Sequence, residues 1–326
     1  MVTPARGTTE ERAVTDLQIV GVGLSTIDVL IRLREMPTFE RGGRMSGFAL
    51  QGGGPVATAM VAAARLGARV GYVGVAGTDE TGDMKVRGLS SEGVDVSRMV
   101  RRPGPEKHIV CVYVHEETGE RTFCGMRDRS PEWPLKPEEL DRAYVTSAPF
   151  LHLDGMGSDA AMQAARWARE AGRTVVFDGA KVTSGDRTHL CEFIELVDVL
   201  IGGSGFVPAL TGERDWRAAG RKALAMGPKI VVQTEGDQGS YTMTADGEFH
   251  VPAFKVPVLD TTGAGDVFHG AYIVGLLQGW DLHRVALFST AVSAIKCGKL
   301  GGRAGIPTFA ETLAFLRERA PDVTFA

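Results

Sequence analysis

A glycine-rich turn leads into a carboxylate within the segment Asp260–Leu277, which reads DTTGAGDVFHGAYIVGLL. Gly263, Ala264 and Gly265 have minimal side chains, so their consecutive backbone N–H groups can point at one spot. At a helix start such a spot favours an anion, because the N–H groups are unpaired and the helix dipole is positive there. Asp266 falls in the first helical turn. An anion cradle beside a fixed carboxylate suits phosphoryl transfer to a hydroxyl group, whose proton the carboxylate accepts. The alternative is a capped helix whose aspartate only stabilises the helix end.

The elements around this segment predict an α/β fold. Leu17–Gly23 has the pattern of a buried strand, Val56–Leu66 that of a helix, and Ala68–Val75 that of a second strand. The same patterns recur further along, as strands at Phe150–Leu153, Thr174–Asp178 and Lys229–Gln233 and as helices at Ala160–Ala171 and Ala218–Ala225. Short links between alternating strands and helices predict a three-layer α/β/α fold with a doubly wound, mostly parallel sheet.

Two stretches interrupt this alternation, Ile31–Gln51 and His108–Phe123. Both have the pattern of extended, hairpin-like chain, with GGR and ETGE as the turns. We expect them to form a small β-sheet that covers the sheet edge as a lid, or else a rigid edge sheet. Residues 1–15 are polar and predict a disordered tail, which leaves residues 16–326 as a single domain.

Composition excludes several classes of protein. The chain has 326 residues, 44% of them hydrophobic, and a formal net charge of −4, so no basic surface points to nucleic acid or to a membrane. The polar N-terminus is unlike a secretory signal, and no apolar run reaches the length of a membrane span. The four cysteines show no metal-ligand spacing, which favours free thiols in a reducing compartment. These features predict a cytoplasmic protein.

From Asp260 to Ile273 the sequence resembles, residue by residue, the second signature of the ribokinase-like (PfkB) carbohydrate kinase family. The resemblance implies transfer of the γ-phosphate of ATP to a sugar hydroxyl, with Mg²⁺ as a cofactor and Asp266 as the catalytic base. It implies that the backbone of Gly263–Gly265 forms the anion hole. It also implies that Asp260, with Thr262, holds a monovalent cation such as K⁺ beside that loop.

The resemblance extends to the substrate side of the chain. GVGLSTID, at 21–28, is similar to the family's first strand, whose terminal aspartate, here Asp28, binds substrate hydroxyls. A lone aspartate after a strand also serves as a cap. The segment 51–67 resembles the first signature, in which the glycine pair, here Gly52 and Gly53, lets the backbone approach the sugar.

Two further segments resemble parts of the family's nucleotide-binding site. VVQTEGDQGS, at 231–240, resembles the strand and glycine turn that contact the nucleotide, with Thr234, Gly236 and Gly239 at the matching positions. KLGGRAGIP, at 299–307, resembles the loop that closes the nucleotide and cation site. Family resemblance also implies a homodimer formed through the small sheet.

The sequence departs from the family pattern at two places. Ala57 stands where the first signature has an asparagine that reads a substrate hydroxyl, which removes a donor and an acceptor. Gly203 and Phe206 stand where the NxxE motif, linked to magnesium and phosphate handling, is expected. Magnesium is then held by the nucleotide and water, or by carboxylates that the sequence does not place.

Within the family, the signatures look most like those of the sulfofructose kinase branch. That branch reads a sulfonate with an asparagine and an arginine, and these positions fall on Gly125 and Met156 here. Arg44, Arg127 and Arg129 can serve an anionic substrate instead, or can be solvated surface residues. The acceptor therefore stays open among ketohexoses, pentoses, sugar acids and, as an alternative, the sulfosugar.

Other functions have less support. A Rossmann dehydrogenase needs GxGxxG after the first strand, and GVGLST lacks its third glycine, while the P-loop pattern GxxxxGK[ST] is absent. A catalytically weak sugar- or nucleotide-binding protein on the same fold is the serious rival. His269, one turn after Asp266, either reaches the site or packs in the core. Asp178 either faces the nucleotide and metal or caps the next turn.

Overall fold

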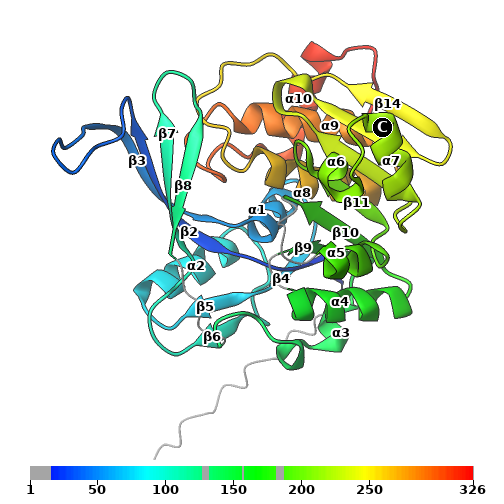
Figure 1. Cartoon of the computed structure of the whole chain (residues 1–326), viewed down its shortest axis with the longest axis horizontal. Coiled ribbons are helices and arrows are strands. Elements are labelled where there is room, and N and C mark those ends of the chain that lie inside the picture. Colours follow the sequence, from blue (N-terminus) through cyan, green and yellow to red (C-terminus); the bar gives the residue numbers. More distant parts are fainter. Residues whose placement is uncertain (1–15, 127–131, 156–157, 181–186, 326) are drawn as a thin grey trace, which may run out of the picture.

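The computed structural model describes residues 16–126, 132–155, 158–180 and 187–325 (Figure 1). The tail predicted at residues 1–15 lies outside this part of the chain. Among the described residues, no helix combines the length and the apolar character needed to cross a membrane.

The main sheet has eight strands in the order β14-β13-β12-β11-β10-β9-β1-β4. Their bounds are β1 Ile19–Val22, β4 Val70–Val73, β9 Phe150–Asp154, β10 Thr174–Gly179, β11 Val199–Gly202, β12 Ile230–Thr234, β13 Ser240–Thr244 and β14 Gly247–Val251. The strands from β12 to β4 run parallel, and β13 and β14 extend the sheet as antiparallel edge strands. Because the strands from β9 to β12 are parallel, their carboxyl ends lie together at one edge of the sheet.

Helices cover both faces of this sheet, which confirms the predicted three-layer fold. One face packs against α1 Pro55–Arg65, α8 Ala264–Leu277, α9 Leu282–Lys296 and α10 Phe309–Arg319. The other packs against α3 Arg142–Val145, α4 Ser158–Glu170, α5 Arg187–Ile194, α6 Phe206–Thr211 and α7 Trp216–Leu224. In β10, Val175 and Phe177 belong to one core and Val176 to the other, because successive strand residues point to opposite faces.

A second sheet of four strands, the small sheet, has the order β3-β2-β7-β8. Its strands are β2 Thr26–Leu33, β3 Met45–Gly53, β7 Ile109–His115 and β8 Arg121–Gly125. In Figure 1 it projects at the left of the main body, as the interruptions in the sequence predicted. The ETGE turn joins β7 and β8, and GGR lies in the connection between β2 and β3. The remaining elements are α2 Glu80–Ser90 and the pair β5 Val75–Gly77 and β6 Val100–Arg102, with short 3₁₀ turns at Pro137–Glu139 and Gly236–Gln238.

The prediction that Asp28 ends the first strand was wrong. β1 ends at Val22, and Asp28 lies within β2, on the small sheet. Between the two strands, the Leu24 N–H donates to Asp154 Oδ2 at 2.8 Å. A side chain on Gly23 would place its Cβ 2.6 Å from Val56 Cγ2, so the turn packs closely on α1.

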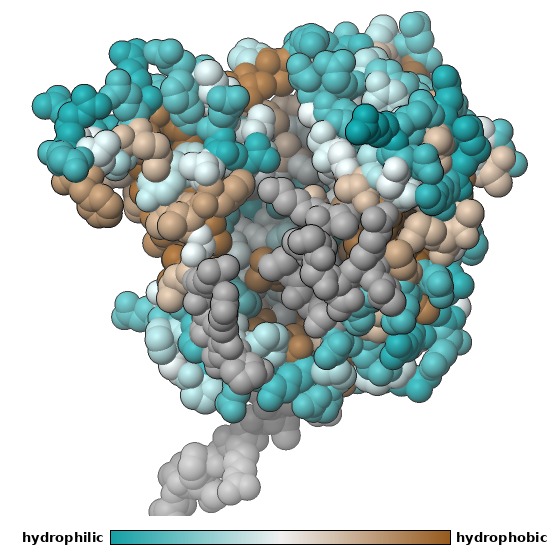
Figure 2. Space-filling view, viewed as in Figure 1, coloured by the Kyte–Doolittle hydropathy of each residue, from teal (hydrophilic) through white to brown (hydrophobic). Residues whose placement is uncertain are grey.

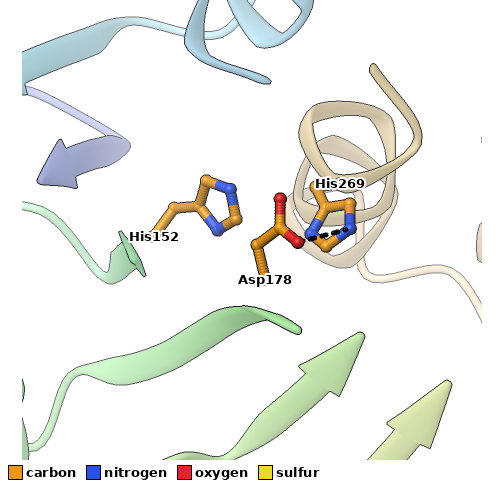
Figure 3. A group of neighbouring side chains, drawn as sticks. All are labelled: His152, Asp178 and His269. Carbon is orange, nitrogen blue, oxygen red and sulfur yellow. Dashed lines mark ion pairs between the residues drawn. The ribbon is translucent and has the colours of Figure 1, made fainter. Parts of the chain in front are cut away.

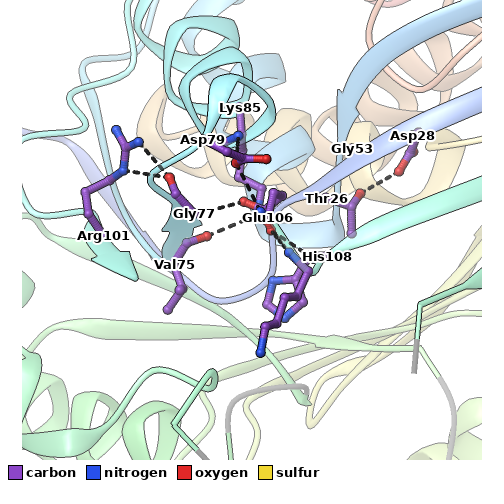
Figure 4. Close-up of polar contacts among 12 residues, drawn as sticks. Thr26, Asp28, Gly53, Val75, Gly77, Asp79, Lys85, Arg101, Glu106 and His108 are labelled. Carbon is purple, nitrogen blue, oxygen red and sulfur yellow. Dashed lines mark hydrogen bonds and ion pairs between the residues drawn. The ribbon is translucent and has the colours of Figure 1, made fainter. Parts of the chain in front are cut away.

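A buried ion pair holds the base of the small sheet (Figure 4). Lys85 Nζ of α2 lies 2.7 Å from Glu106 Oε1, and the two side chains are 1% and 0% exposed. Glu106 also accepts the backbone N–H groups of Gly77 at 3.0 Å and His108 at 2.8 Å. Burial lowers the pKa of Lys85 to about 8 despite the charge of Glu106. Burial alone would raise the pKa of Glu106, but Lys85 and the N–H donors lower it below its ordinary value.

We expect Glu106→Gln to lower the free energy of unfolding by about 3–5 kcal/mol, because it leaves the Lys85 ammonium buried without its counter-charge. Urea denaturation at neutral pH measures the change. The matched control is Glu117→Gln, which breaks the exposed pair between Arg34 and Glu117. That pair is worth about 1 kcal/mol or less. Equal losses in the two variants would contradict the structural role of the buried pair.

Candidate active site

The glycine turn predicted before Asp266 lies at the start of α8. Gly263 is the N-cap of α8 with a φ of 74°, a conformation that favours glycine. A Cβ on Gly263 would lie 2.8 Å from the Cα of Gly302, so a larger residue is also excluded by space. Ala264 and Gly265 begin the helix, and Gly265 is exposed with nothing within 4 Å of the position of a Cβ. There is therefore open space beside Gly265, while the Ala264 N–H donates to the Thr261 carbonyl at 3.2 Å.

A cleft of about 510 Å³ lies against this helix start. It is lined by the residues predicted to bind the nucleotide, Thr234, Gly236 and Gly239, together with Ala264 and Gly265. Phe254 and Phe268 add apolar walls, and Gly203 and Ser204 contribute from the end of β11. Residues far apart in the sequence thus meet at the carboxyl edge of the main sheet, where such folds bind ligands.

The predicted substrate residues meet at a second place, where β2 and β3 approach α1. A Cβ on Gly53 would lie 2.1 Å from Asp28 Oδ2, and one on Gly52 would lie 2.3 Å from Arg303 Nη1. The glycine pair therefore leaves room for these two side chains. Arg303 is 6% exposed and donates to Gly53 O at 2.8 Å and to Thr58 Oγ1 at 3.3 Å. Sequence reasoning assigned the Arg303 loop to the nucleotide side and missed this contact.

Burial and nearby charges set the protonation of the carboxylates. Burial and, next, the charge of Asp28 raise the pKa of Asp266 to about 6, against the opposing charges of Arg121, Lys296 and Arg303. Burial also raises the pKa of Asp28, against its hydrogen bond from Thr26 and the charge of Arg303. Asp266 and Asp28 therefore lie within electrostatic reach of each other, although Asp28 lies in β2 of the small sheet and Asp266 in α8.

One arginine links the small sheet to the turn before α8. Arg121, at the start of β8, donates from Nη1 to Thr261 Oγ1 and lines the cleft. A Cβ on Gly119, in the preceding turn, would lie 3.4 Å from Leu259 O, so this turn also approaches the same loop. No sequence signal identified Arg121, because its role follows from the packing of two distant segments.

The predicted cation ligands are engaged by protein donors. Asp260 is 0% exposed, and its Oδ1 accepts from the N–H and the hydroxyl of Thr262 at 2.8 and 2.7 Å. Its Oδ2 accepts from Gly301 N at 2.7 Å. Lys296 Nζ, also fully buried, donates to the carbonyl of Asp260 at 2.9 Å. This network ties the turn before α8 to the end of α9 and to the loop that follows it.

A buried cluster of His152, Asp178 and His269 lies where β9 and β10 face α8 (Figure 3). One potential metal-ligand atom from each lies within 4.8 Å of the others, and His269 Nε2 is 3.7 Å from Asp178 Oδ1. Burial, with Asp266 and Asp154 nearby, raises the pKa of Asp178 well above its ordinary value. Burial, and then His152, lowers the pKa of His269 well below its ordinary value. Burial thus disfavours the charged form of both Asp178 and His269, and the 3% exposure of His269 favours the core role for this residue.

Other predicted positions lie away from these contacts. Arg44 is exposed in the connection between β2 and β3, and Gly125 is exposed in β8. Met156, Arg127 and Arg129 lie outside the described residues. Where the asparagine is missing, Ala57 is fully buried in α1.

The positions of the missing NxxE motif lie beside another carboxylate. Gly203 lines the cleft, whereas Phe206 is 2% exposed in the core. Glu235, directly after β12, accepts hydrogen bonds from Ser204 and Gln233. Its carboxylate therefore sits beside the segment in which the motif is missing, a proximity that the sequence did not reveal.

Comparisons with known proteins identify the family and the fold. Residues 16–309 match the model of the pfkB family carbohydrate kinases. An ATP-dependent ribose-1-phosphate kinase of Halopiger xanaduensis is 31% identical over 93% of this chain and 99% of its own. A ribokinase of Thermotoga maritima matches with a TM-score of 0.79 and 26% identity, over 93% of this chain and 100% of its own. A putative ribokinase II of E. coli in complex with ATP and Mg²⁺ matches with a TM-score of 0.82 and 24% identity, over 93% and 99% of the two chains. The chain belongs to the pfkB family of carbohydrate kinases and has the ribokinase-like fold.

Proposed function

We propose that residues 16–326 form one catalytic unit that transfers the γ-phosphate of ATP to a hydroxyl of a sugar or sugar-like molecule. Asp266 is the general base, and the backbone of Gly263, Ala264 and Gly265 is the anion hole. The observation that carries this proposal is the place of Asp266. It lies in the first turn of α8, beside the cleft and within electrostatic reach of Asp28.

The chemistry follows from that placement. Asp28 accepts hydrogen bonds from sugar hydroxyls near Gly52 and Gly53. Asp266 takes the proton of the attacking hydroxyl, which makes the oxygen a better nucleophile. The N–H groups at the start of α8 stabilise negative charge on the transferring phosphoryl group, because they are fixed before the reaction begins. Thr234, Gly236 and Gly239 hold the nucleotide in the cleft.

The described residues fit a magnesium ion that is bound mainly by the nucleotide. Mg²⁺ prefers oxygen ligands and retains several waters. Glu235 provides a carboxylate at the edge of the cleft, held by Ser204 and Gln233. In the proposed site it takes the place of the missing NxxE glutamate and binds a water of the ion. The ion supplies neutralisation of phosphate charge.

The acceptor class follows from relatives and from one substitution. Curated relatives are named as a ribose-1-phosphate kinase, 5-dehydro-2-deoxygluconokinases and probable fructokinases. Ala57 removes an amide that would read a hydroxyl, and the buried Arg303 guanidinium lies nearby against Thr58. Ketohexoses, pentoses and sugar acids are the proposed candidates. A thermal-shift screen over these sugars, their phosphates and sulfofructose, followed by an ADP-release assay, identifies the acceptor and separates a kinase from a binding protein.

We also propose that two copies associate through the small sheet. Large apolar side chains of this sheet are exposed: in β3, Met45 at 61%, Phe48 at 59% and Leu50 at 44%, and in β8, Phe123 at 57%. Figure 2 shows brown and tan residues on this projecting part of the molecule. Exposed apolar groups of this kind mark interaction surfaces. The proposed location is the cytoplasm, where ATP is available and Cys111, Cys124, Cys191 and Cys297 stay free.

Asp266→Asn is expected to lower kcat by roughly 10²–10⁴-fold, because the change is nearly isosteric and removes only the proton acceptor. The Kd for ATP, measured by isothermal titration, should stay within a few-fold of the wild-type value. Steady-state ADP release with the identified sugar measures kcat. Turnover equal to wild type in a folded variant would remove Asp266 from the role of base.

The pH dependence of kcat/KM should have an acidic limb near pH 6. Asp266 is the ionised base above its pKa of about 6 and carries a proton below it, so activity rises with pH through that value. Asp28→Asn should move the limb to lower pH, since it removes a negative charge that raises the pKa of Asp266. A limb that stays in place in this variant would contradict the coupling of the two carboxylates.

The small sheet is expected to move over the sugar as a lid. Closure excludes water from the γ-phosphate. Without closure, water could attack the γ-phosphate and hydrolyse ATP. Hydrogen exchange should slow in residues 31–51 and 108–123 when the sugar saturates the enzyme. Arg121→Ala should weaken that protection, because it removes the contact with Thr261. Unchanged exchange in both segments would leave a rigid edge sheet as the explanation.

A further inference from the structure

A fully buried lysine lies directly under the anion-hole turn. Lys296 is the last residue of α9 and is 0% exposed. Its Nζ donates to the carbonyl oxygen of Asp260 at 2.9 Å. Placing an ammonium group away from water is costly unless nearby groups compensate for it. The burial of the Lys296 ammonium group therefore indicates a specific role for this residue.

The oxygens around this ammonium do not fit a bound K⁺. An alkali cation needs several free oxygen ligands, because it must replace its hydration shell. Here the Asp260 carbonyl accepts from Lys296, and both carboxylate oxygens accept from Thr262 or Gly301. The Cys297 carbonyl accepts from Leu259 N at 2.8 Å. Donors that belong to the chain thus already hydrogen-bond to each of these oxygens, and the Lys296 ammonium is one of these donors.

We propose that the Lys296 ammonium is a built-in monovalent cation. It supplies from within the chain the positive charge that the family resemblance assigns to K⁺ beside the anion hole, and the enzyme therefore works without K⁺. This inference rests on the proposed kinase function of the same site and departs from the K⁺ expectation at Asp260 and Thr262.

The position of Lys296 allows its charge to act on the reacting groups. Ser293, one turn earlier in α9, donates from its hydroxyl to Ala264 O at 2.8 Å, so the end of α9 is attached to the start of α8. The charge of Lys296 is among those that hold down the pKa of Asp266. Burial lowers the pKa of Lys296, and the charges of Asp260 and Asp266 counter that effect. The lysine thus positions the turn and favours an anion there.

The first test uses the wild-type enzyme. ADP release is measured with the acceptor found in the sugar screen, at constant Mg²⁺ and ionic strength, in choline, K⁺ and NH₄⁺ salts. We expect rates that agree within about twofold, since equal ionic strength gives equal screening. Activation by K⁺ of about tenfold or more over choline, a difference of about 1.4 kcal/mol in the barrier, would overturn the inference.

Two substitutions then separate charge from volume. Lys296→Ala removes the charge and opens a cavity, whereas Lys296→Met removes the charge and fills the space. Both should lose roughly tenfold or more in activity, because a unit charge close to the phosphoryl group is lost. Added NH₄⁺ or K⁺ should restore Lys296→Ala and not Lys296→Met. Lys222→Ala is the control, because Lys222 is an exposed lysine of α7, on the opposite face of the main sheet, and it should behave as wild type.

Thermal unfolding gives a readout that does not need turnover. NH₄Cl should raise the Tm of Lys296→Ala relative to choline chloride, and should leave wild type and Lys296→Met unchanged. Absence of that response in a folded Lys296→Ala would overturn the inference. If the wild-type enzyme phosphorylates no sugar, the proposed kinase function is wrong. The thermal comparison would still test the cation site in that case. Should Lys296→Ala not fold, the wild-type salt series decides.

Discussion

The buried carboxylate of Asp260 is the constraint on which the geometry of the site depends. Its two carboxylate oxygens accept hydrogen bonds from Thr262 and Gly301. The backbone carbonyl of the same residue accepts one from Lys296. A buried charge persists only when it is so satisfied, because desolvation is otherwise too costly. These bonds tie three segments into one unit and thereby set the direction in which α8 begins. Because Asp266 lies in the first turn of α8, that unit also fixes its position.

The site gathers several buried carboxyl groups, which are costly to place in a protein core. Asp28, Asp178 and Asp266 all have raised pKa values, with burial as the largest cause. Positive charge comes from Arg121 on the small sheet and from Arg303 after α9. Such arrangements concentrate at functional sites, where the pKa is tuned to the chemistry at the expense of stability. The small sheet thus contributes the Asp28 carboxyl group and the Arg121 guanidinium to this set of charges.

At the two positions where the family pattern fails, side chains from other segments occupy the neighbouring space. Near Ala57, the Arg303 guanidinium contacts Thr58 and Gly53. Near the missing NxxE motif, Glu235 is held beside Ser204. A site needs certain groups in certain places, and the fold can deliver them from different parts of the chain. This distribution is what makes the acceptor hard to identify from the signatures.

The sequence by itself determined the α/β alternation, the small sheet and the turn that leads to Asp266, because these depend on local periodicity and on glycine spacing. Only the tertiary structure decided that Asp28 belongs to the small sheet and that Arg121, Arg303 and Lys296 converge on the site. The physical reason is that each of these contacts joins segments distant in sequence: Arg121 meets Thr261 from 140 positions away. Local patterns carry no record of such contacts, whose formation depends on how the sheets and helices pack.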